Sequence, residues 1–327
     1  MIAFLCNGEK WKYIGKLRKI ALTFGFHYYI TDSVAQISEV LAEMAENQIQ
    51  IICVLGGDGT ICQLVSAVFR RRERLKQSSL PPKIAVLGGG TMNNLFSVLK
   101  LRGPPDHLAK KIVEEATNSQ LKVIKLPLLR VTHNGQVYFG FTFILGPIVR
   151  LLKQYTDNQR NFSRAMMTAV LACSAATVKW PKNFTSLIKP FEAQILVNDR
   201  RIQFNNLSGI LASTVRRTAF GFYPFLGNEF LVSPKFDRFY TIICGLSPNE
   251  IVAKIFYLGY LHFWDIFFPS SGLRARNQYF NQPVNNLRIR NPSEDIFTID
   301  GEIFPIQKGK EITVSFGPEI SLVCPSY

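Results

Sequence analysis

Two patterns of apolar and polar residues alternate along the first third of the chain. Four short apolar runs have the length and the β-branched or aromatic content of buried strands: Ile2–Cys6, Phe26–Ile30, Ile49–Leu55 and Lys83–Leu87. After each run, apolar residues recur every three to four positions, which is typical of an amphipathic helix. Strand–helix alternation of this kind predicts an α/β domain with a parallel sheet and helices on both faces.

The pattern changes after about Leu121 to short alternating strands with few helices. Asn134-Gly135 separates Leu128–Thr132 from Gln136–Phe141, which predicts a β-hairpin. Further strands are predicted at Phe191–Val197, Ile202–Phe204, Gly209–Ser213, Phe239–Cys244, Leu287–Arg290, Ile296–Ile299, Glu311–Phe316 and Ile320–Cys324. Helical patterns interrupt this region at about Ile148–Val178 and from Ser247 onward.

These patterns predict two domains and a terminal strand. We expect the α/β domain over residues 1–122 and a mainly antiparallel β-sandwich domain with helical insertions over residues 123–318. Residues 319–327 are expected to form a C-terminal strand that returns to the first domain.

Composition narrows the class of protein. The longest apolar runs are broken well before the ~18 residues that a bilayer crossing requires, and Met1–Cys6 has the pattern of a core strand rather than of a signal peptide. The six cysteines are scattered without Cys-x-x-Cys spacing, which favours reduced thiols and a cytoplasmic protein. The four histidines are far apart, which argues against zinc and leaves a hard cation as the expected metal.

The formal net charge of +15 favours anionic partners. We expect peripheral association with the inner face of a membrane. No recognisable nucleic-acid-binding motif is present, so nucleic acid is not the expected partner. A homodimer is kept as an open alternative for the oligomeric state.

The strongest candidate for chemistry is Gly56-Gly57-Asp58-Gly59-Thr60, which joins a predicted buried strand to a predicted helix. Glycines let backbone N–H groups approach a ligand closely, and the positive end of the following helix favours phosphate. Asp58 would repel phosphate unless a divalent cation lies between them or the carboxylate accepts a proton. The alternative is a tight surface turn, in which Gly and Asp are also common.

Two further segments add to this candidate site. Gly88-Gly89-Gly90-Thr91-Met92-Asn93-Asn94 follows another predicted strand and would line the same crevice, although glycine runs also mark plain loops. Asp300-Gly301-Glu302 lies late in the β-rich region and is equally compatible with an ordinary β-turn.

Together these residues resemble the diacylglycerol kinase catalytic family, in particular the small soluble bacterial lipid kinases that are related to sphingosine and ceramide kinases. Gly56–Thr60 is similar to the family's Gly-Gly-Asp-Gly-Thr, Gly90-Thr91-Met92-Asn93 to its Gly-Thr-x-Asn, and Asp300-Gly301-Glu302 to its Asp-Gly-Glu. The resemblance implies an ATP-dependent kinase that phosphorylates a hydroxyl of a lipid such as diacylglycerol, with ATP bound in the cleft between the two domains.

The resemblance also implies roles for single residues. Nucleotide would contact Asn7, Thr31, Gly56, Gly57, Asp58, Gly59, Thr60, Gly89, Gly90, Thr91 and Asn93. Asp58 would organise Mg²⁺ and the phosphates, and Asp300 or Glu302 would take the proton of the lipid hydroxyl. Asp237 resembles the aspartate of a Mg²⁺ site that orders the β domain.

Some positions depart from the family pattern. The early Asn-Pro-x-x-Gly is reduced to Asn7-Gly8, Cys62-Gln63 replaces the usual Asn-Glu, Ser97 stands where an arginine is frequent, and Arg238 follows Asp237 in place of glycine. Two alternatives therefore stay open: a kinase of a soluble acceptor such as NAD, and a catalytically weakened relative that binds lipid.

Overall fold

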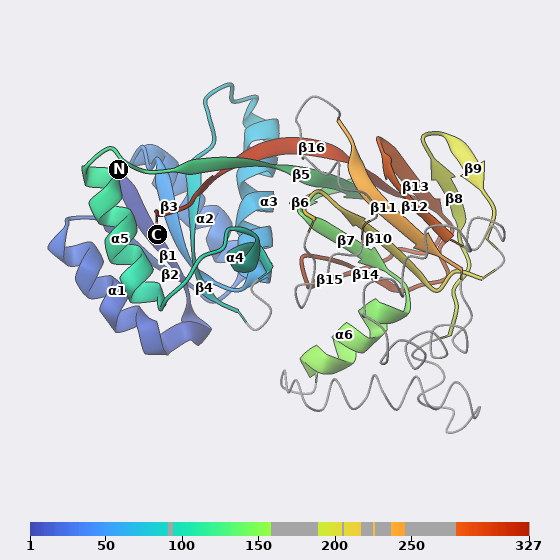
Figure 1. The fold of residues 1–327 in the computed structure, drawn as a ribbon, viewed down its shortest axis with the longest axis horizontal. Coiled ribbons are helices and arrows are strands. Elements are labelled where there is room, and N and C mark those ends of the chain that lie inside the picture. Colours follow the sequence, from blue (N-terminus) through green and yellow to red (C-terminus); the bar gives the residue numbers. More distant parts are fainter. Residues whose placement is uncertain are drawn as a thin grey trace.

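The chain folds into two halves, an α/β half and a β half, joined by two long strands (Figure 1). The computed structural model describes residues 1–90, 94–157, 189–204, 206–216, 225, 237–245 and 279–326. An α/β part followed by a mainly antiparallel part confirms the fold class that the sequence predicts.

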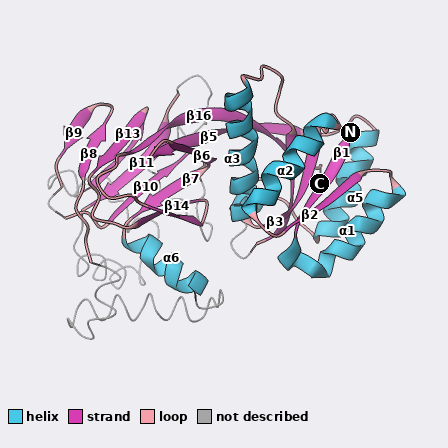
Figure 2. Ribbon diagram, turned by 180° about the vertical axis from the view of Figure 1, so that it is seen from behind, coloured by secondary structure: helices cyan, strands magenta, loops and turns pink. Residues whose placement is uncertain are grey.

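The first half is a parallel sheet covered on both faces. Its own strands are β1 (Ile2–Asn7), β2 (His27–Thr31), β3 (Ile51–Gly56) and β4 (Lys83–Gly89), hydrogen-bonded in the order β2-β1-β3-β4. Helices α1 (Trp11–Thr23) and α5 (Pro105–Thr117) pack on one face. Helices α2 (Val34–Glu46) and α3 (Asp58–Leu75) pack on the other, the face turned to the viewer in Figure 2. The single turn η1 (Gly8–Lys10) and the short helix α4 (Asn94–Val98) complete this half.

Burial explains why these helices form where the 3.6-residue pattern predicts them. In α1 the apolar positions Leu17, Ile20 and Ala21 are buried against the sheet, and Leu64 and Val65 of α3 are buried on its opposite face. Ser33 caps α2, since its hydroxyl accepts a hydrogen bond from the Gln36 N–H.

Strands β5 (Val123–His133) and β16 (Ile312–Val323) form an antiparallel ribbon that runs through both halves. Near its end β16 pairs in parallel with β4, where Leu322 faces Ile84. The prediction of two separate strands at Glu311–Phe316 and Ile320–Cys324 is wrong. These residues form one strand with a change of register between Phe316 and Glu319. The proposed domain bounds stay a prediction.

The β half has a second sheet with the order β12-β11-β10-β7-β14-β15. It packs against strands of the first sheet around a buried apolar core that includes Phe143, Phe239 and Phe297. The strands of this half are β6 (Gln136–Gly140), β7 (Thr142–Leu145), β8 (Gln194–Val197), β9 (Arg200–Ile202), β10 (Gly209–Ser213), β11 (Phe239–Cys244), β12 (Tyr279–Val284), β13 (Asn286–Arg290), β14 (Ile296–Ile299) and β15 (Glu302–Pro305).

The predicted hairpin is confirmed: Asn134 and Gly135 both have positive φ, 49° and 73°, between β5 and β6. The sequence did not predict β7, β12 or β15. The helix expected over Ile148–Val178 begins as α6 (Pro147–Asp157), and its remainder lies outside the described residues, as does the helix expected from Ser247. Among the described residues, no helix combines the length and apolarity needed to cross a membrane.

Candidate active site

The residues that the sequence singles out lie at the carboxyl ends of the parallel strands. Asn7 at the end of β1 pairs with Thr31 at the end of β2, and Gly56 at the end of β3 pairs with Gly89 at the end of β4. All four therefore stand along one edge of the sheet. This is the edge at which open α/β sheets bind ligands.

The first glycine loop turns directly from β3 into α3. Gly57 is the N-cap of α3, and Asp58 is its first residue. A Cβ atom placed on Gly57 would lie 3.0 Å from the Gly90 Cα, so the two glycine loops touch backbone to backbone. Gly89 has φ of +120°, a conformation that L side chains rarely adopt. The result is a side-chain-free surface at the positive end of a helix.

Hydrogen bonds tie this loop to its neighbours. The Asn7 side-chain amide donates to the Thr60 hydroxyl at 3.2 Å, and Asp58 Oδ1 accepts the Leu95 N–H at 3.3 Å. The loop is thereby linked to β1 on one side and to α4 on the other. Thr91 and Asn93 fall on the short segment between β4 and α4 that lies outside the described residues.

The Asp300-Gly301 turn between β14 and β15 brings two carboxylates from the β half to the loop. Asp300 and Gly301 have positive φ, 49° and 88°. The Asp300 carboxylate accepts the Phe141 N–H at 2.9 Å and the Thr142 N–H at 2.8 Å, and the Asp300 N–H donates to the Thr142 carbonyl. Glu302 lies directly over Gly59, because a Cβ atom there would collide with Glu302 Oε1.

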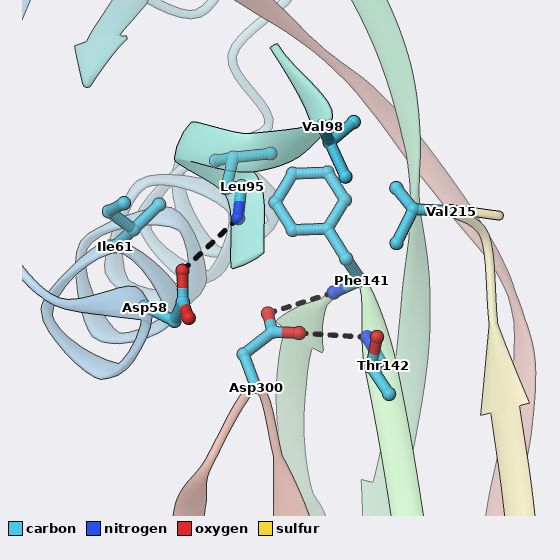
Figure 3. Close-up of a pocket in the computed structure, with 8 residues that line it drawn as sticks. All are labelled: Asp58, Ile61, Leu95, Val98, Phe141, Thr142, Val215 and Asp300. Carbon is cyan, nitrogen blue, oxygen red and sulfur yellow. Dashed lines mark hydrogen bonds between the residues drawn. The ribbon is translucent and has the colours of Figure 1, made fainter. Parts of the chain in front are cut away.

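A pocket opens between the two halves at this point (Figure 3). Asp58 and Asp300 face it from opposite sides, and its walls are otherwise mostly apolar. Burial raises the pKa of Asp300 to about 7, hydrogen bonds from Phe141 and Thr142 oppose that rise, and the nearby charge of Asp58 adds to it. The lining residues are Asp58, Ile61, Leu95, Val98, Phe141, Thr142, Val215 and Asp300.

The amino-terminal part of this site matches a known protein family. Residues 6–126 match the model of the diacylglycerol kinase catalytic domain, a range that holds Asn7, Thr31 and both glycine loops. Over this range the chain is similar to the diacylglycerol kinase catalytic family. The Asp300–Glu302 turn lies outside the matched range, yet the fold brings it onto the matched loop.

Three curated bacterial proteins are similar to this chain. A protein of Streptococcus pneumoniae named "Putative lipid kinase" is 24% identical over 119 residues, 36% of this chain and 35% of that protein. Two Staphylococcus aureus proteins, named "Putative lipid kinase SAS0691" and "Putative lipid kinase MW0688", are each 26% identical over 229 residues, 69% of this chain and 64% of theirs. The chain thus matches about a third of the first relative and somewhat less than two thirds of the others.

Solved structures share the fold of this chain. A diacylglycerol kinase from Bacillus anthracis superposes with a TM-score of 0.60 at 15% identity, covering 99% of this chain and 96% of that one. A second structure from the same organism gives 0.64 at 16% identity, covering 99% and 95%. At such low identity the likeness shows the fold alone.

The departures from the family pattern have defined places in the structure. Gln63 Nε2 donates to Glu302 Oε2 at 3.5 Å, so the replaced position still contacts the Asp-Gly-Glu turn. Cys62 is buried beside β6, where its thiol donates to the Phe139 carbonyl at 3.6 Å, and burial raises its pKa well above the ordinary value. Cys62 is therefore a neutral thiol that packs between α3 and β6.

The pocket has too few carboxyl groups to bind a metal ion with protein ligands alone, but its two carboxylates suit a hard cation that also binds phosphate. The described residues contain no cluster of three or more His, Cys, Asp or Glu side chains placed to hold a metal. Two carboxylates in one pocket suit Mg²⁺, which commonly uses one or two carboxylates together with substrate phosphates. Asp237 is exposed just before β11 with φ of 44°, and its assignment to a metal stays a prediction.

The sequence does not identify the residues that fix the α/β half against the β half. Phe141 and Thr142 act through backbone N–H groups, which leave no trace in residue type. Ser66 lies within a helix with the composition of an ordinary core helix, yet its hydroxyl is bonded to the β half. Val215 contributes only an apolar wall.

Proposed function

We propose that this chain is an ATP-dependent kinase that transfers the γ-phosphoryl group to a hydroxyl of a lipid such as diacylglycerol. One observation carries the proposal: the Asp300-Gly301-Glu302 turn from the β half lies directly against the glycine loop of the α/β half. Groups suited to hold phosphate and carboxylates suited to receive a proton thus meet at one pocket. The match of residues 6–126 to the diacylglycerol kinase catalytic domain and the similarity to proteins named as lipid kinases support it.

The glycine loops would hold the nucleotide. ATP supplies the phosphoryl group, and the residues at the sheet edge fit its phosphates because two side-chain-free loops and the positive end of α3 converge there. Asn7 would keep Thr60 in place through their hydrogen bond, and Thr31, buried at the end of β2, would border the same edge. We extend the site to Thr91 and Asn93 on the family resemblance.

The two carboxylates of the turn would divide the work. Both oxygens of Asp300 accept backbone hydrogen bonds, which fixes the carboxylate and suits it to position the turn. Glu302 projects over the first turn of α3 and receives one long hydrogen bond from Gln63. We assign to Glu302 the proton of the acceptor hydroxyl, whose oxygen forms the new bond to phosphorus as ADP leaves.

Asp58 would hold Mg²⁺ beside the phosphates. Its carboxylate lies at the first position of α3 and faces Asp300 across the pocket. Burial is the main cause of the raised pKa of Asp300, and a divalent cation would offset the smaller contribution that the charge of Asp58 makes. Positioning and charge neutralisation dominate phosphoryl transfer, so losing this group should cost activity far more than stability.

The acceptor would reach the pocket from a membrane. A diacyl lipid stays largely in its bilayer, and the net charge of +15 attracts the protein to anionic lipid. Peripheral association with the inner face of a cytoplasmic membrane is part of the proposal. The apolar side chains of Ile61, Val98 and Phe141 suit the pocket to an alcohol rather than to a second nucleotide.

Kinase assays test the proposal directly. Purified protein is incubated with labelled ATP and Mg²⁺, and with diacylglycerol, monoacylglycerol, sphingosine, ceramide or polyprenol in mixed micelles, or with NAD. We expect a labelled lipid, a loss of about 10²-fold or more in kcat for Asp58→Ala, and a similar loss for Glu302→Gln.

Asp106→Ala is the matched control, because Asp106 also lies in the first turn of a helix but pairs with Lys16 away from the pocket. It should retain full activity. If labelled NADP were the only product, the acceptor would be a soluble molecule and not a lipid. If the protein bound anionic vesicles but consumed no ATP, it would be a lipid-binding protein and not a kinase.

A further inference from the structure

Phe139 of β6 connects the glycine loop to the carboxylate turn. Among the described strands β6 pairs with β5 alone, and its other edge faces α3. On that edge the Ser66 hydroxyl donates to the Phe139 carbonyl at 2.9 Å and accepts the Phe139 N–H at 2.8 Å. One buried side chain therefore satisfies both backbone groups of Phe139 on the edge of β6 where no described strand pairs with it.

Neighbouring positions on the same face of α3 support this link. The Cys62 thiol donates to the same carbonyl, and the rings of Phe69 and Phe139 lie 5.4 Å apart. Residues 62, 66 and 69 share one helix face, so this face of α3 is fastened to a single point of β6. Ser66 supplies the two short hydrogen bonds of that contact.

From Phe139 the connection continues to the acidic turn. Two residues along the chain, the Phe141 N–H bonds to Asp300, and the Thr142 N–H bonds to the other carboxylate oxygen. Gly140, which lies between Phe139 and Phe141, has no room for a side chain, because a Cβ atom there would lie 2.5 Å from Asp300 Oδ2. The span from α3 through 139–142 to Asp300 is thus short and closely packed.

From this geometry we infer that Ser66 is a positioning residue for phosphoryl transfer. It fixes the separation between Asp58 and Gly59, on the first turn of α3, and the Asp300–Glu302 turn. The inference rests on the proposed function and deepens it. Because transfer depends on in-line alignment, a displacement of about 1 Å can reduce the rate about 10²-fold.

Ser66→Ala is the primary test. The nucleotide loops stay on α3 and on the parallel sheet, so the KM for ATP should change less than about twofold, while kcat falls about 10-fold to 100-fold. Hydrogen exchange at the Phe139 amide should become faster, because its acceptor is removed. Ser66→Thr keeps the hydroxyl and should restore most of the kcat.

Ser208→Ala is the matched control, since the buried Ser208 hydroxyl also donates to a backbone carbonyl, that of Cys244, at the opposite end of β10 from the pocket. It should leave kcat unchanged. An active wild type together with a folded Ser66→Ala variant of normal kcat would overturn the positioning role. A wild type that phosphorylates no acceptor would overturn the proposed function itself, and with it any part for Ser66 in the reaction.

Discussion

Asp300 is a half-buried acid whose proton affinity depends in part on a second carboxylate across the pocket. Its pKa rises from an ordinary value of 3.8 to about 7 in the folded protein, first through burial and then through the charge of Asp58. The folded state therefore keeps a proton that the unfolded chain releases above about pH 4. This coupling makes the stability of the protein depend on pH in a defined direction.

We expect the free energy of unfolding of the wild type, measured relative to Asp300→Asn, to be largest below pH 4 and to decline as pH rises to about 7. The slope for one proton cannot exceed about 1.4 kcal/mol per pH unit. Urea unfolding from pH 4 to 8 measures it. A relative stability that grows with pH would contradict the raised pKa.

Asp58→Asn provides the second arm of this test. Removing the opposing charge should lower the pKa of Asp300, so the decline should end at a lower pH than in the wild type. Asp106→Asn, which removes a carboxylate from the first turn of α5, should not change the pH range over which the relative free energy of unfolding declines.

Two glycines of the loop have separable roles, because each lies against a different neighbour. An alanine Cβ at position 57 would press on the Gly90 backbone, whereas one at position 59 would press on the end of the Glu302 side chain. We expect Gly57→Ala to raise the KM for ATP and Gly59→Ala to lower kcat, each about 10-fold or more.

Steady-state kinetics distinguish the two variants, and Gly15→Ala is the matched control. Gly15 lies in α1 with open space around it, so alanine there should leave the kinetics unchanged and raise the free energy of unfolding by about 0.5–1 kcal/mol. Identical kinetic effects of Gly57→Ala and Gly59→Ala would contradict the division of roles.

At the scale of elements, α6 is attached to the β half by an ion pair between the partly exposed Arg150 and the buried Glu294. Arg150 forms two hydrogen bonds with the Glu294 carboxylate and a third with the Lys189 carbonyl. Glu294 is buried, and its loop leads into β14 and so toward Asp300. This pair fixes where α6 meets the sheet that carries the acidic turn.

Glu294→Gln should cost about 2 kcal/mol of unfolding free energy, because it removes the charge from the buried carboxylate that accepts two hydrogen bonds from Arg150. Denaturant unfolding measures the loss. Glu311→Gln breaks the more exposed pair with Arg290 and should cost less than about 1 kcal/mol. Equal losses in the two variants would show that burial does not strengthen the Arg150–Glu294 pair.

The elements of the α/β half could be predicted because each has a strong local pattern. Ile51–Gly56 is fully buried, so its sequence is a continuous apolar run, and glycines mark its end. Once parallel strands were predicted, the meeting of Asn7, Thr31 and the glycine loops at one edge followed from topology.

The elements that were missed lack such patterns. β12 carries Asn281, Gln282 and Pro283, and β7 is only four residues long. Gly317-Pro318 has the composition of a turn, but it forms the irregularity inside β16, where a Cβ atom on Gly317 would lie 2.9 Å from the Leu128 carbonyl oxygen. The link from Ser66 to Phe139 depends on how the two halves pack, which no local pattern encodes.

At the scale of the whole molecule, the net charge of +15 should govern binding to membranes. We expect the protein to sediment with vesicles that contain anionic phosphatidylglycerol and to remain in solution with neutral phosphatidylcholine vesicles. Raising the salt from about 0.1 M to 1 M shortens the screening length from about 10 Å to about 3 Å and should release it. Sedimentation that is unchanged by salt would point to apolar anchoring instead.

The path of β16 has a consequence for synthesis on the ribosome. The sheet of the first half receives its fifth strand from residues 312–323, which are translated long after β4. At about 5–20 residues per second, the edge of β4 waits for its partner on the order of ten seconds or more. During that interval a nascent chain exposes an unpaired, apolar strand, so chaperone capture should be strongest before the last strand emerges.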